Sequence, residues 1–132
     1  MSNFEKYEYW LDLCEDDLTT AKWLLEGNRL LHCGFFCHLI AEKALKAVIA
    51  NETGETPEKT HDLQKLANQG NVLDKLSEQQ LKFLDELMSL QIEARYPEYK
   101  EKISQSLNKE YCVKMVEETE VFLCWTKQLL GK

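Results

Sequence analysis

One short stretch of the chain combines basic and aromatic residues that could bind a phosphate group. Arg95, Tyr96, Tyr99, Lys100 and Lys102 follow one another closely in an otherwise acidic sequence. A guanidinium group forms paired hydrogen bonds with phosphate oxygens, and a tyrosine ring can stack on a nucleobase. These residue types predict a nucleotide- or RNA-binding surface. The alternative is structural: Arg95 complements the C-terminal end of a helix, and the two lysines lie on a solvated linker.

A second set of polar residues interrupts a very apolar stretch. His38, Glu42 and Lys46 are spaced four residues apart within residues 34–50, so they form one line along a helix. Glu before Lys at this spacing favours an ion pair, and a histidine one turn earlier could exchange a hydrogen bond with Glu42. Acid–base chemistry is one interpretation. The other is a solvated seam, or a polar contact to a neighbouring helix.

A third candidate is His61, which lies between Thr60 and Asp62 where a short helix is expected to begin. We predict that Thr60 caps this helix and that Asp62 lies in its first turn, where an acidic residue is favoured. The free N–H groups of a helix N-terminus suit an anion. An ordinary capping turn with an exposed histidine is the alternative.

Metal and cofactor signatures are absent from the sequence. The five cysteines include no CxxC pair. Cys33 and Cys37 lie one helical turn apart beside His38, but no second pair with ligand spacing accompanies them. The cysteines are therefore expected to be reduced thiols in a core. No phosphate-binding loop, dinucleotide fingerprint, HExxH or GxSxG motif occurs, so we expect no metal and no cofactor.

The elements that position these residues are helices. The stretch 34–50 is apolar around most of its circumference, so other helices must cover it. With Glu42, Lys43 and Lys46 inside it, the stretch is not expected to cross a membrane. The other helices are expected at residues 4–26, 61–69, 78–95 and 109–130.

Capping signals support these boundaries. Ser77 and Gln80 have the form of a capping box, and Asn108 can cap the last helix. Pro97 restricts Tyr96, so the fourth helix should stop near Arg95. We therefore predict one all-α domain over residues 1–132, an up-and-down bundle of four long helices and one short helix.

The net charge of the chain and the apolar pattern of one helix limit the partners that we expect. Twenty-three acidic and 16 basic residues give a net charge of −7, which resists general adhesion to nucleic acid or anionic membranes. Contact with nucleic acid would have to be local. The N-terminus carries no secretion signal, so we expect a cytoplasmic protein. The helix expected at 78–95 is apolar on two faces, which predicts contact with a second chain and hence a homodimer.

Three segments together resemble the HEPN family of small helical domains: residues 35–50, FFCHLIAEKALKAVIA; residues 60–67, THDLQKLA; and the end of a helix, ARYPEY, at 94–99. The resemblance implies a bundle of four to five helices that forms homodimers and binds nucleotides. It also implies a minimal nucleotidyltransferase as a frequent partner, in a toxin–antitoxin-like pair.

The resemblance also implies which residues a ribonuclease of this family would need. In the ribonuclease branch of that family, a histidine follows an arginine at this helix end. Arg95 matches the arginine, whereas Lys100, Glu101 and Lys102 occupy the positions that should hold the histidine. A lysine is a poor general base near neutral pH.

The leading hypothesis is therefore a binding module with no chemistry of its own. One alternative is a weak, atypical metal-independent ribonuclease. It would use Arg95 with Tyr99 or Lys100, or with His61 or His38 brought across a dimer. The other alternative is a purely structural interaction protein.

Overall fold

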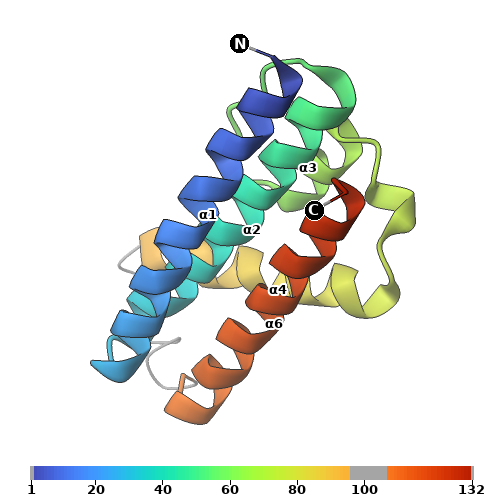
Figure 1. The fold of residues 1–132 in the computed structure, drawn as a ribbon. Helices are drawn as coiled ribbons and strands as arrows, with labels where there is room; N and C mark the ends of the chain where they lie inside the picture. The colour runs from blue at the N-terminus through green and yellow to red at the C-terminus, as the bar shows by residue number, and fades with distance from the viewer. Residues whose placement is uncertain (1, 96–106, 132) are drawn as a thin grey trace.

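Two long antiparallel helices form the frame of the molecule. The computed structural model describes residues 2–95 and 107–131. Helix α1 (Asn3–Glu26) is capped by Ser2, and the chain then reverses through Asn28, whose φ of 58° is left-handed. Helix α2 (Leu30–Thr53) runs back beside it (Figure 1). Two contacts support this arrangement: Lys6 Nζ donates to Gly54 O at 3.0 Å at one end of the pair, and Lys43 lies 2.6 Å from Asp17 near its middle.

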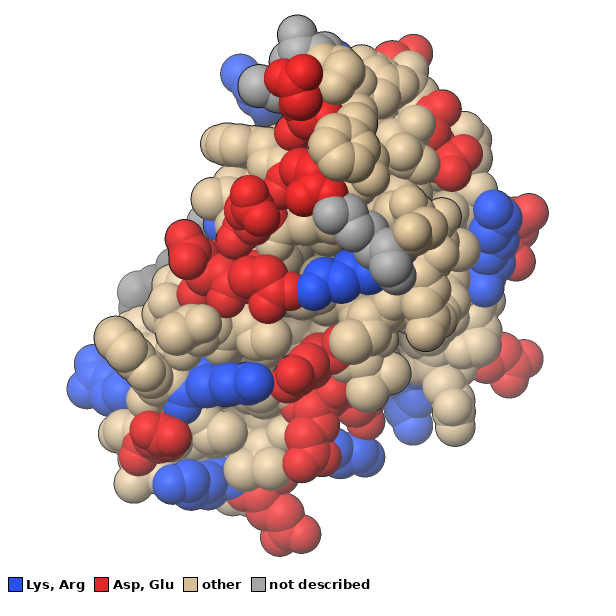
Figure 2. All heavy atoms as spheres, viewed as in Figure 1, with Lys and Arg blue, Asp and Glu red and all other residues tan. Residues whose placement is uncertain are grey.

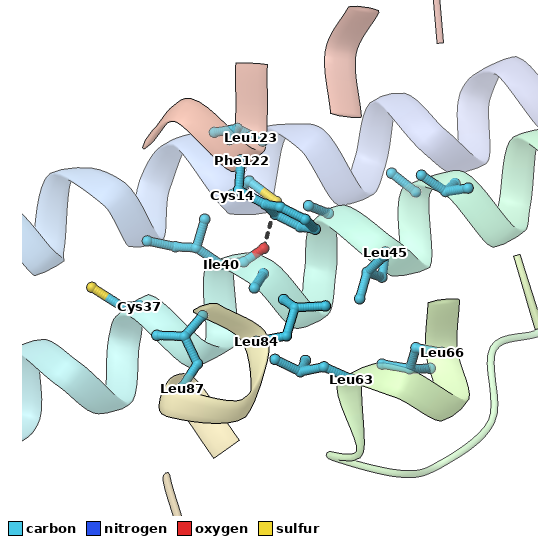
Figure 3. Close-up of a cluster of buried hydrophobic side chains, with 14 of the residues drawn as sticks. Cys14, Cys37, Ile40, Leu45, Leu63, Leu66, Leu84, Leu87, Phe122 and Leu123 are labelled. Carbon is cyan, nitrogen blue, oxygen red and sulfur yellow. Dashed lines mark hydrogen bonds between the residues drawn. The ribbon is translucent and has the colours of Figure 1, made fainter. Parts of the chain in front are cut away.

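Helix α2 is the central element, as predicted, and it contacts α1, α3, α4 and α6. It is longer than the expected 34–50 at both ends, since the mostly apolar residues 30–33 begin the helix and residues 51–53 extend it. It ends where Gly54 adopts a left-handed φ of 69°. Figure 3 shows side chains from several helices meeting on α2, where the Cys14 thiol also donates to Ile40 O.

A short helix and a long one cover a further side of α2. Helix α3 (Leu63–Gln69) buries Leu63 and Leu66, and a 3-10 turn (Leu73–Lys75) follows. Helix α4 (Glu78–Arg95) begins with the predicted capping box: Gln80 N donates to Ser77 Oγ, and Ser77 N donates to Gln80 Oε1. The helix runs across α2 and α6 in Figure 1.

Helix α6 (Lys109–Leu129) completes the bundle. Asn108 caps it as predicted, accepting a hydrogen bond from Tyr111 N. The helix runs antiparallel to α1, and two ion pairs join them, Lys22 with Glu120 and Lys127 with Glu15. Its buried face consists of Cys112, Met115, Val116, Thr119, Phe122, Leu123 and Thr126, whereas Leu130 is partly exposed.

The prediction of an all-α bundle of four long helices and one short helix is confirmed. No strand occurs among residues 2–95 and 107–131. In the same ranges, no helix has the length and apolar character needed to span a membrane.

Candidate functional site

The structure joins two of the three predicted candidates into one cluster. We call His38, Glu42, Lys46 and His61 the Glu42 cluster, because the other three side chains surround this carboxylate. His61 Nδ1 lies 2.7 Å from Glu42 Oε1, and Lys46 Nζ lies 3.1 Å from Glu42 Oε2. His38 Nδ1 lies 3.9 Å from Glu42 Oε1. His38, Glu42 and Lys46 thus lie in line along α2, as predicted, and His61 joins them from the segment between α2 and α3.

Burial differs sharply within the Glu42 cluster. The side chain of His38 is fully buried, and that of Glu42 is 5% exposed. The side chain of His61, by contrast, is 49% exposed. The cluster therefore begins inside the bundle and ends at the surface with one imidazole ring.

Local structure before α3 holds His61 in place. Thr60 is not the helix cap: the Asp62 carboxylate accepts hydrogen bonds from Gln64 N at 3.0 Å and Lys65 N at 3.2 Å, so the helix begins at Leu63. Thr60 Oγ1 instead accepts a bond from Asp62 N. The prediction of a Thr60 cap was wrong because the charged Asp62 carboxylate, two residues later, accepts from the free N–H groups of the first turn of α3.

The backbone of His61 is held as well as its ring. His38 Nε2 donates to His61 O at 2.9 Å, since a carbonyl oxygen can only accept. The two imidazole rings lie with their centroids 6.3 Å apart. His38 thus acts as a buried support for the segment that presents His61.

The electrostatics of the Glu42 cluster favour a charged carboxylate. Burial of Glu42 is the largest single effect and disfavours ionisation, but the hydrogen bond from His61 and the charge of Lys46 together outweigh it. The pKa of Glu42 is therefore lowered from the ordinary value of 4.5. Lys46 in turn lies over the ring of Trp10, 5.2 Å from its centroid, so α1 also contributes to the site.

The remaining predicted site residues are Arg95 and four residues that follow it in the sequence. Arg95 is the last residue of α4, as expected from Pro97. Tyr96, Tyr99, Lys100 and Lys102 lie outside the described residues.

Four of the five cysteines are core residues. Cys14, Cys33, Cys37 and Cys112 are buried and Cys124 is exposed, all as free thiols. Burial raises the pKa of Cys14 to about 12, so this thiol is inert at neutral pH. Within the described ranges, no group of three or more His, Cys, Asp or Glu residues is arranged to hold a metal ion.

Sequence reasoning missed an open groove between α4 and α6. Its volume is ≈ 790 Å³, and charges of both signs line it, from Lys82 and Glu86 on α4 and Lys114 and Glu117 on α6. The helical patterns give no signal for it, because it arises from the crossing of two helices distant in sequence.

Comparison with known proteins gives one match. No curated protein and no solved structure matches the chain. The model of the HEPN domain family matches residues 7–129, nearly the whole chain, which agrees with the three sequence segments and with the helical bundle. On that evidence, the chain belongs to the HEPN domain family.

Proposed function

We propose that this protein binds RNA or a nucleotide through the surface at the C-terminal end of α4, and that it acts as a homodimer with a small nucleotidyltransferase in a toxin–antitoxin-like pair. Membership of the HEPN family supports a helical module related to nucleotides or RNA. The observation that carries the proposal is that α4 ends at Arg95, in the segment that also supplies Tyr96, Tyr99, Lys100 and Lys102.

The charge distribution supports a local binding surface. Figure 2 shows acidic side chains gathered over α1, where Glu5, Asp12 and Asp16 are exposed. A nucleic acid phosphate would be repelled from that face. Residues 95–102 hold three basic residues, Arg95, Lys100 and Lys102, beside two acidic ones, Glu98 and Glu101.

Most of the large apolar side chains of α4 are buried within the single chain. Leu84, Leu87 and Leu90 are buried against the core, and Phe83 contacts Phe122 of α6 with ring centroids 5.9 Å apart. Ile92 is 39% exposed and lies one turn before Arg95. An exposed isoleucine beside the proposed binding end is the feature of α4 that favours a second chain there.

Binding is tested by titrating purified protein with ATP, GTP and a fluorescent single-stranded RNA. We expect Arg95→Ala to weaken binding by about tenfold or more, because charged hydrogen bonds contribute about 1.5–3 kcal/mol. Lys82→Ala is the matched control, since Lys82 is an exposed cation on the same helix. Absence of binding, or equal effects of the two substitutions, would contradict the proposal.

The partners are tested separately. Light scattering of the purified protein should give the mass of a dimer, and a monomer at working concentration would contradict the homodimer. A nucleotidyltransferase encoded in the neighbouring reading frame should co-purify after co-expression. If no partner co-purifies and no nucleotide or RNA binds, a purely structural role would replace the proposal.

A further inference from the structure

The groove between α4 and α6 continues along the exposed side of α6. Its main part has a volume of ≈ 790 Å³, and a second hollow of ≈ 440 Å³ shares Lys114 and Glu117 with it. Together the two hollows follow α6 from Asn108 to Phe122, about 21 Å along the helix axis. The groove is therefore about as long as a helix of four turns.

The floor of the groove is aromatic, and its rim carries exposed apolar side chains. Phe83 and Phe122 are buried with ring centroids 5.9 Å apart, and the ring of Trp125 lies 5.6 Å from that of Phe122. Val121 is 69% exposed, and Val113, on the same face of α6 two turns earlier, is 37% exposed. Apolar surface of this kind, next to a groove, is typical of a site that contacts another protein.

Both walls of the groove present side chains at helical spacing. Residues 79, 82, 83 and 86 of α4 form one wall, and residues 114, 117, 118 and 121 of α6 form the other. Rows of side chains three and four residues apart are the ridges against which another helix packs. Pockets for small molecules, by contrast, enclose most of their ligand. The open groove between two such rows therefore suits an added helix.

The charges of the walls leave an unmatched group on each helix. Lys114 Nζ lies 3.7 Å from Glu118 Oε1, so these two form a pair within α6. Lys82 of α4 and Glu117 of α6 line the groove but form no ion pair with any residue in the ranges 2–95 and 107–131. A partner with charges of the opposite sign would find both groups available.

The acidic groups outnumber the basic ones. Glu86 accepts a hydrogen bond from the neutral Tyr111 hydroxyl at 3.1 Å, so it keeps its negative charge. Glu86 and Glu117 thus face the groove from opposite walls without a cation of their own. An RNA phosphate would be repelled by them, whereas a lysine or arginine of a protein would be attracted.

We infer that this groove is a docking site for an amphipathic helix of another protein. The helix places large aliphatic side chains over Phe83 and Val121, and it directs a lysine or arginine toward Glu86 and Glu117. A second copy of the chain that presented the same groove would instead bring an excess of carboxylates together. The inference goes beyond the proposed function and does not depend on RNA or nucleotide binding at Arg95.

The test uses a synthetic fluorescent peptide of about 16 residues, with Leu at every third or fourth position and Lys beside this apolar stripe. It should bind saturably, and a peptide of the same composition in scrambled order should bind at least about tenfold more weakly, because it has no apolar face. Amide chemical shifts of the labelled protein should change within residues 78–86 and 108–122.

Val121→Glu separates docking from general attraction. It places a carboxylate where an aliphatic side chain must be buried, so affinity for the peptide should fall by about tenfold or more. Because the variant is more acidic, unspecific attraction of a cationic peptide predicts the opposite change. Trp23→Glu is the matched control: it makes the same charge change at a 73% exposed apolar residue of α1, outside the groove, and should not weaken binding.

A charge exchange tests the expected ion pair. Glu117→Lys should weaken binding by about tenfold, and a peptide whose Lys residues are replaced by Glu should bind this variant more tightly than wild type. Glu52→Lys, at an exposed carboxylate of α2, measures the effect of net charge alone and should change affinity much less. Circular dichroism should confirm that each variant is folded.

The outcomes distinguish the possible occupants. Absence of peptide binding, shifts outside the groove, or equal affinities of Val121→Glu and Trp23→Glu would each overturn the inference. So would a dimer that Val121→Glu dissociates, which would identify a second copy as the occupant, or displacement of the peptide by single-stranded RNA. Arg95→Ala tests the proposed function separately, so either proposal can fail without the other.

Discussion

At the scale of single residues, Glu42 connects the interior of the bundle to its surface. Its carboxylate is almost completely buried, yet it is charged, because His61 and Lys46 each donate to one of its oxygens. A buried charge is tolerated only when its hydrogen-bonding capacity is used. Removing one partner should therefore be more harmful than removing an exposed carboxylate.

The lowered pKa of Glu42 predicts a pH-dependent contribution to stability. A carboxylate whose pKa is lower in the folded state than in the unfolded state stabilises the protein at pH values above its unfolded pKa of 4.5. This stabilisation is lost as the pH falls through the lower pKa of the folded state. Glu42→Gln should thus cost about 2 kcal/mol at neutral pH and progressively less toward about pH 3. Urea unfolding of the wild type and the variant at both pH values measures this difference in the free energy of unfolding. Glu52→Gln, at an exposed carboxylate of α2, should cost little at either pH.

At the scale of elements, the segment between α2 and α3 determines where His61 lies. Gly54 ends α2 in a left-handed conformation, and Asp62 starts α3. The seven residues of α3 are too few for a stable isolated helix, so its position depends on the cap and on Leu63 and Leu66 against the core.

The cap assignment makes a prediction for α3. Asp62→Ala should destabilise the protein by about 1 kcal/mol, because two backbone N–H groups lose their acceptor. Thr60→Ala should cost less, since Thr60 accepts one bond at a turn. Thermal or urea unfolding ranks the variants, and Asp62→Asn should remain close to wild type. The opposite order would show that the helix is capped from Thr60 after all.

At the scale of the whole molecule, a net charge of −7 is combined with three basic residues close together at 95–102, Arg95, Lys100 and Lys102. Exposed carboxylates cover the outer face of α1, so phosphate contacts are confined to few residues. Affinity for nucleic acid should therefore depend on salt only weakly.

The expected salt dependence can be stated as the slope of log K against log salt concentration. Each phosphate contact contributes about −0.7 to the slope of log K against log salt for single strands. With Arg95, Lys100 and Lys102 as the cations, the slope should be about −2, and Arg95→Ala should make it less steep by about 0.7. Fluorescence titrations of RNA over a series of salt concentrations measure it. A slope several times steeper would contradict a local surface and indicate a broad one.

The sequence by itself determined the helices and their order. Apolar residues at helical spacing identified α1, α2, α4 and α6, and the cap at Asn108 and the capping box at Ser77 marked two boundaries to within a residue. These signals are local, because they depend on contacts within a few residues of the same helix. The same segments also indicated the HEPN family, which the family model confirms.

Only the tertiary structure decided which polar residues meet. His61 and Glu42 are 19 residues apart and had been separate candidates, since no local spacing encodes the path by which a loop returns to a helix. Burial of Glu42 likewise depends on α1 and α3 covering α2, and the groove between α4 and α6 depends on how those helices cross. Helical periodicity specifies the face of a helix, whereas packing of the whole chain specifies what lies against that face.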